Sequence, residues 1–121
     1  MQQTISDLGL LLSLDRFAGQ ADIIDADARQ QRDGSWRFDV TIYTNKPNAQ
    51  HYADRWEVLT EEGEVLAITY MSLNDQTEQP CNQTMTGVMI PDNVKLVYLR
   101  AHDSNLGYAG NTITLPLQRL N

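Results

Sequence analysis

The chain has 121 residues, enough for one domain with its own hydrophobic core. Its formal net charge of −7 disfavours binding to nucleic acid or to an anionic membrane surface, because both require a basic protein surface. A single cysteine, Cys81, excludes an internal disulfide and a zinc site built from cysteines.

Residues 1–21 support two interpretations. The apolar run 8–14 (LGLLLSL) has the length of a signal-peptide core, and small residues at 19–21 (GQA) suit a cleavage site. The residues before this run, however, contain no Lys or Arg and include Asp7, and a short helix capped by Ser6 or Asp7 fits the same pattern. This stretch is therefore predicted to be either a degenerate signal-like segment or a short helix. No run of about 20 apolar residues predicts a membrane-spanning helix.

From residue 22 the hydrophobic pattern changes to a period of two, which is typical of a β-strand with one buried face. Residues 22–29 alternate in this way. An Asp-Gly pair within 32–35 (RDGS) then predicts a hairpin turn. The next strand is predicted from apolar residues that alternate with polar ones and should face the core: Trp36, Phe38, Val40 and Ile42.

A central hairpin is predicted from residues 51–58 and 65–73, which flank a turn at 60–64 (TEEGE). The remaining predicted strands are 84–90, 94–102 and 111–117, with connections at 74–82, 91–93 and 103–110. Seven short strands with turns at this spacing predict an all-β, seven-stranded antiparallel sandwich over residues 22–118.

Two segments resemble parts of fibronectin type III and immunoglobulin-like domains. Residues 86–92 (TGVMIPD) look like the E–F turn of that fold, and residues 100–103 (RAHD) with Gly107 and Gly110 look like its F–G region. The resemblance implies an immunoglobulin/fibronectin III-like sandwich. Lys95 falls roughly where the fold usually has its corner tyrosine, so that feature of the family is absent.

Several motifs in one order resemble an uncharacterised family of small, usually exported bacterial β-sandwich proteins. The motifs are DGSWRFDVT at 33–41, HYADRWEVL at 51–59, EQP at 78–80, AHDS at 101–104 and GY at 107–108. The family has a His-Pro-His element before EQP and a Phe after it, whereas this chain has Ser72-Leu73-Asn74 and Cys81 near those places. The resemblance implies a periplasmic or secreted location and carries no assigned chemistry. A cytoplasmic location is the alternative.

Sandwich topology predicts that three separate segments meet at one end of the molecule. The B–C, C′–E and F–G connections share that end, and they contain or adjoin His51, Glu78 and the pair His102-Asp103. Imidazoles of His51 and His102, with a carboxylate from Asp103, Glu78 or Asp54, could hold Cu(II) or Zn(II). The alternative is that these groups fasten loops, with the histidines donating to carbonyls and Asp103 accepting loop amides. Two histidines are fewer than most such metal sites use, which favours the alternative.

Strand alternation predicts that Asp54 points toward the core with Trp56 and Val58. A buried carboxylate requires a partner, and Arg100 is the candidate for a structural ion pair. Residues 102–104 (HDS) contain the letters of a hydrolase triad, but neighbouring strand residues point to opposite faces. No other catalytic motif is present, so the chain is predicted not to be an enzyme.

Two hypotheses for function follow. The first is a non-enzymatic sandwich whose loop end binds a small ligand, including a transition metal. The second is a protein interaction or structural module without a small ligand, which docks on an unknown protein partner through an exposed sheet face or an edge strand. Neither hypothesis involves nucleic acid or insertion into a membrane.

Overall fold

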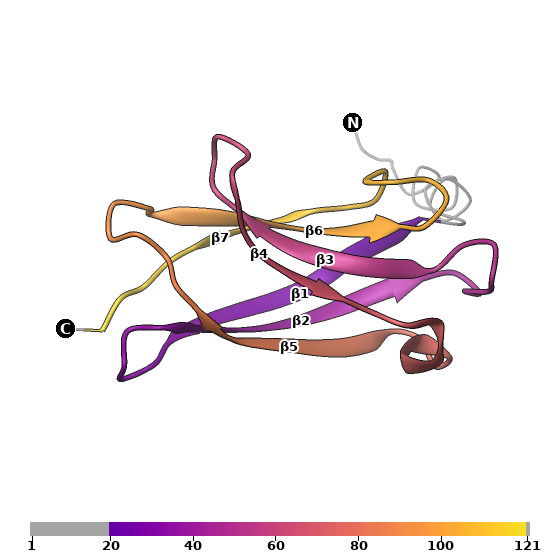
Figure 1. Cartoon of the computed structure of the whole chain (residues 1–121), viewed down its shortest axis with the longest axis horizontal. Helices are drawn as coiled ribbons and strands as arrows, with labels where there is room; N and C mark the ends of the chain where they lie inside the picture. Colours follow the sequence, from indigo (N-terminus) through magenta and orange to yellow (C-terminus); the bar gives the residue numbers. More distant parts are fainter. Residues whose placement is uncertain (1–19, 121) are drawn as a thin grey trace, which may run out of the picture.

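The computed structural model describes residues 20–120, which form two antiparallel β-sheets around one core (Figure 1). The three-stranded sheet has the order β1 (Ala21–Gln30), β2 (Trp36–Thr44) and β5 (Cys81–Val88). The four-stranded sheet has the order β4 (Val65–Tyr70), β3 (Ala53–Leu59), β6 (Leu96–Asp103) and β7 (Ile113–Pro116). A short 3₁₀ helix, η1 (Leu73–Gln76), follows β4. The predicted all-β, antiparallel architecture is confirmed.

The predicted N-terminal segment lies outside the described residues, apart from its last two positions. Ala21 already belongs to β1, where it pairs with Thr44. Among residues 20–120, no helix has the length and apolar character needed to cross a membrane.

The core lies between the sheets and follows the predicted alternation. In β2, Trp36, Phe38, Val40 and Ile42 are all buried, while the residues between them are more exposed. The opposite sheet contributes buried residues from β3 and β6: Trp56, Val58, Val97, Leu99 and Ala101. Because a side chain on a strand points to the face opposite its neighbours, these strands each present one apolar row to the core.

The predicted Asp-Gly turn connects β1 to β2. Gly34 has a φ of 91°, a left-handed conformation that glycine adopts without steric cost. The backbone amide and hydroxyl of Ser35 donate to the Asp33 carboxylate at 2.9 and 2.7 Å. These two hydrogen bonds lower the pKa of Asp33.

The predicted connection 74–82 ends earlier than expected, because β5 begins at Cys81 and not at the predicted Thr84. Asn82 pairs with Thr41 and Thr84 pairs with Asp39. Their side chains lie on the outer face of the three-stranded sheet, where water replaces a second layer. A polar run is therefore compatible with a strand at this position.

Three loops converge at one end of the molecule, on the right in Figure 1, as the sequence predicted. Buried Gln76 joins two of them, because its side chain accepts from the Ala53 amide at 2.9 Å and donates to the Ala53 carbonyl at 2.8 Å. The third loop, between β6 and β7, is attached to the residues that precede β3, since the Ser104 amide donates to the Tyr52 carbonyl at 2.8 Å.

Candidate functional site

At the loop end, His51 lies beside Asp103 but not beside His102. The distance from His51 Nδ1 to Asp103 Oδ2 is 3.4 Å, and neither atom has a hydrogen-bond partner among the described residues. The other oxygen of the buried Asp103 carboxylate accepts the amides of Asn105 and Leu106 at 2.8 and 2.9 Å. The prediction that Asp103 fastens its loop through backbone amides is confirmed.

His102 faces the opposite side of β6, because it neighbours Asp103 on the strand. Its Nδ1 lies 2.7 Å from Asp54 Oδ1, and its ring packs edge-on against Tyr108 at a centroid distance of 4.7 Å. Each histidine therefore has its own carboxylate. Both side chains are only 18% exposed.

The structure brings the predicted metal ligands together only in pairs. His51 contacts Asp103, and His102 contacts Asp54, while the exposed Glu78 has no hydrogen bond or ion pair to either histidine. Within residues 20–120, no group of three or more His, Cys, Asp or Glu side chains could hold a metal ion. The copper or zinc site stays a prediction, which titration of chelator-stripped protein and of the H51A and H102A variants would decide.

The predicted ion pair between Asp54 and Arg100 is wrong. The pairing of β3 with β6 is irregular between Ala53 and Arg55, and fully buried Ala53 takes the inward position. Asp54 is thereby displaced from the inward row and meets His102 on the other side of the sheet. Arg100 instead bonds Glu57, with an Nε to Oε1 distance of 2.9 Å.

Glu57 is the centre of a polar cluster on the outer face of the four-stranded sheet. It is almost fully buried, although strand alternation directs it away from the core. Tyr108, from the β6–β7 loop, covers Glu57 and donates to its Oε2 at 2.5 Å. Arg100 stacks on the Tyr108 ring at 3.7 Å, and Arg55 donates to the Tyr108 hydroxyl at 3.2 Å. That bond to Tyr108 is the main cause that raises the pKa of Arg55.

The carboxylate of Glu57 is compensated within this cluster. Two guanidinium groups and one phenol surround a single carboxylate, so Glu57 is buried without being left unpaired. The arrangement fixes the β6–β7 loop on the sheet. Sequence reasoning missed Glu57, because its partner Tyr108 lies 51 positions away.

Next to this cluster, strand β4 forms an apolar edge. Its six residues, VLAITY, include no charge, proline or glycine. Tyr70 is 71% exposed, and Val65 and Ile68 are 41% and 40% exposed. Ile68 lies beside Glu57 and Tyr70 beside Arg55, so both side chains extend the outer face of the sheet.

The backbone of β4 is open on one side. The Met71 amide, just after the strand, donates to the Asp54 carbonyl at 3.0 Å. In an antiparallel pair, residues whose backbone groups face the partner alternate with residues whose groups face away. Counting back from Met71, the N–H and C=O groups of Ile68 and Tyr70 therefore face away from β3. Among the described residues, β4 pairs with no other strand.

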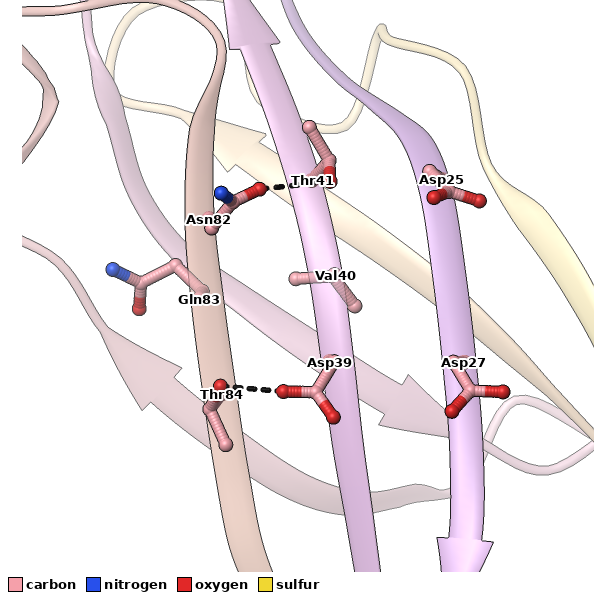
Figure 2. Close-up of a pocket in the computed structure, with 8 residues that line it drawn as sticks. All are labelled: Asp25, Asp27, Asp39, Val40, Thr41, Asn82, Gln83 and Thr84. Carbon is pink, nitrogen blue, oxygen red and sulfur yellow. Dashed lines mark hydrogen bonds between the residues drawn. The ribbon is translucent and has the colours of Figure 1, made fainter.

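A second polar surface lies on the outer face of the three-stranded sheet (Figure 2). This surface contains an open cavity of about 280 Å³. The cavity is lined by Asp25, Asp27, Asp39, Val40, Thr41, Asn82, Gln83 and Thr84. The Thr84 hydroxyl donates to Asp39 at 2.6 Å, and Arg37 bonds the same carboxylate at 2.9 Å. The hydrogen bond from Arg37 lowers the pKa of Asp39 most, and the hydrogen bond from Thr84 lowers it further. The Asp39 carboxylate is therefore already bonded by side chains of its own sheet.

Comparison with known proteins gives one distant relative. No family model matches the chain, and no solved structure matches it. A protein of Halomicrobium mukohataei named "Putative lipoprotein" is 26% identical over 96 residues, which are 79% of this chain and 47% of that protein. The chain therefore spans about half the length of this relative.

Proposed function

We propose that this protein is a non-enzymatic interaction module that binds an extended strand of a protein partner at the β4 edge. One observation carries the proposal: β4 combines exposed apolar side chains with backbone groups that face away from β3, the one strand with which it pairs among residues 20–120. Main-chain hydrogen bonds to such an edge supply affinity, and side-chain contacts on alternate positions supply specificity.

Tyr70 and Ile68 suit this role. Tyrosine provides a large contact area with few rotatable bonds, and aromatic residues are enriched in the cores of protein interfaces. The neighbouring cluster around Glu57 is internally paired, so it forms a fixed floor beside the edge. A partner strand would meet a preorganised surface and would pay little to order it.

The proposal includes an immunoglobulin/fibronectin III-like identity for the fold. The sheets β1-β2-β5 and β4-β3-β6-β7 fit the chain path of such a sandwich, with β2 to β6 in the places of strands B, C, C′, E and F. It also includes an exported location, periplasmic or secreted. The name of the Halomicrobium relative supports export, as does the signal-like run at 8–14.

A matched pair of variants at Ile68 tests the proposal. The Ile68→Pro change removes the N–H group that faces the open edge and keeps the hydrogen bonds to β3, since proline is tolerated on edge strands. The Ile68→Thr change keeps the N–H group and a β-branched side chain. Thermal unfolding of both variants verifies that they fold.

The probe is a neutral peptide, acetyl-Ser-Ser-Thr-Val-Thr-Val-Thr-Ser-Ser-amide, titrated into ¹⁵N-labelled protein. We expect saturable shifts of the β4 amide signals and slower hydrogen exchange at Ile68 and Tyr70. Ile68→Thr should retain these effects and Ile68→Pro should lose them. Shifts located elsewhere, or a folded Ile68→Pro variant that binds as well as the parent, would contradict strand addition at β4.

A further inference from the structure

The ends of the β4 edge are acidic. Three exposed carboxylates precede the strand in the β3–β4 turn: Glu61, Glu62 and Glu64. Two more exposed carboxylates follow it, Asp75 in η1 and Glu78 just beyond. Within residues 20–120, none of these five forms an ion pair.

The interior of the edge differs from its ends. Between the acidic flanks, the exposed side chains Val65, Ile68 and Tyr70 are uncharged. On the adjacent strand β3, Glu57 is paired with Arg55 and Arg100, so it leaves no unpaired negative charge beside this centre. The edge therefore presents an apolar centre bounded on both sides by negative charge.

We infer that the partner strand at β4 has an apolar centre flanked by basic residues at both ends. This inference rests on the proposed function and names the chemistry of its partner. A strand that pairs with residues 65–70 places its own ends beside the acidic flanks, because each strand residue advances by about 3.3 Å in both chains. Lys or Arg at those ends would then lie within a Debye length, about 8 Å at physiological ionic strength, of the carboxylates.

The same charges disfavour a second copy of this chain as the partner. A paired copy would bring its own carboxylates at 61–64 and at 75–78 to the region of β4, in either strand direction. The net charge of −7 on each copy adds to this repulsion. Like charges across a contact suppress the wrong partner and opposite charges select the right one.

The inference is tested by measuring, through fluorescence anisotropy, how tightly two labelled peptides bind the intact protein. Both keep the centre Thr-Val-Thr-Val-Thr, and one has two Lys at each end while the other has two Glu. At about 50 mM salt we expect the Lys-flanked peptide to bind about tenfold more tightly, which corresponds to modest contributions from several exposed charge pairs. At about 500 mM salt the preference should shrink to less than about threefold, because salt screens exposed charges.

The variant Glu61→Gln/Glu62→Gln/Glu64→Gln removes one acidic flank, and we expect it to lose most of the preference. The control Asp25→Asn/Asp27→Asn/Asp92→Asn removes the same amount of charge from exposed positions outside β4 and its flanks, and it should keep the preference. An equal loss in both variants would mean that net charge alone selects the peptide, which would overturn the inference.

The outcomes separate the inference from the proposed function. If the neutral, Lys-flanked and Glu-flanked peptides all bind β4 equally, the inference is overturned and strand addition stands. If none of the peptides binds, both are overturned. Sedimentation equilibrium of the protein alone should give a monomer, and a dimer that Ile68→Pro disrupts would replace the basic partner with a second copy.

Discussion

Strands β1 and β4 are both edge strands, yet their exposed positions differ in chemistry. The exposed residues of β1 include Asp25, Asp27 and Arg29, whereas β4 has no charged residue. Charged side chains on an edge discourage pairing with another chain, and their absence leaves an edge open. Pairing with another chain is therefore disfavoured at the β1 edge and favoured at the β4 edge.

The β6–β7 loop also covers the start of β1, at residues 21–23. The Ile23 amide donates to the Asn111 carbonyl at 3.0 Å, and the Asn111 amide donates to Asp22 at 2.6 Å. Gly110 makes this approach possible, because a Cβ atom there would lie 1.8 Å from the Ala21 carbonyl oxygen. The loop that covers β1 also carries Tyr108, which covers Glu57, so one loop contacts both sheets.

The largest expected effect comes from opening the β1 edge. The Gly110→Ala change forces the loop away from Ala21 and should destabilise the protein by about 3 kcal/mol, as other steric overlaps with rigid surroundings do. Gly34→Ala is the control: its Cβ meets no atom within 4 Å, so only the left-handed backbone is strained, at a cost of about 1 kcal/mol. Urea unfolding measures both, and equal losses would contradict the close approach.

The second-largest loss of stability is expected from substitutions in the polar cluster beside β4. Glu57→Ala leaves two guanidinium groups without their carboxylate and should cost about 2–3 kcal/mol in the free energy of unfolding. Tyr108→Phe removes two hydrogen bonds, the one donated to Glu57 and the one accepted from Arg55, and keeps the ring over Arg100, so about 1–2 kcal/mol is expected. If Glu57→Ala costs less than Tyr108→Phe in urea unfolding, Glu57 is not the centre of the cluster.

The third effect concerns the pH dependence of the β1 edge. Burial raises the pKa of Asp22, and the hydrogen bond from the Asn111 amide offsets only part of this rise. The protonated form is thus favoured in the folded protein. The stabilisation it provides is present below the unfolded-state pKa, about 3.9 for Asp, and is lost as pH rises through the folded-state pKa.

Asp22→Asn should therefore raise the melting temperature at neutral pH, since Asn keeps an oxygen that can accept from Asn111 and carries no charge. The gain over the parent should shrink as the pH falls toward 3. Melting temperatures of both proteins between pH 3 and pH 7 measure this difference. A gain that grows toward acid would have the opposite sign and would refute the assignment to Asp22.

The smallest effect on stability is expected when a charged residue is added to the β4 edge or removed from the β1 edge. Ile68→Lys adds a charge to β4, and Asp27→Val removes one from β1, at positions that are exposed in the folded protein. Each should change the free energy of unfolding by less than about 0.5 kcal/mol. Light scattering on heating should show less aggregation for Ile68→Lys and more for Asp27→Val. The reverse order would mean that β4 is not the open edge.

The local features of this protein follow from its amino-acid sequence. Alternation from Trp36 to Ile42 predicted which side of β2 is buried, and the Asp-Gly pair predicted the turn before it. Both follow from interactions between residues close in the chain. The convergence of three loops was also predictable, because it depends only on the strand directions and on the sandwich topology.

The environment of individual polar groups and the identity of the open edge depend on contacts between residues far apart in the chain. The irregular pairing near Ala53 turned Asp54 toward His102, and a loop 51 positions away buried Glu57. The run VLAITY is as apolar as a central strand, and nothing within it indicates an edge. A strand becomes an edge only through the pairing of other strands, which depends on contacts between distant residues and not on its own sequence.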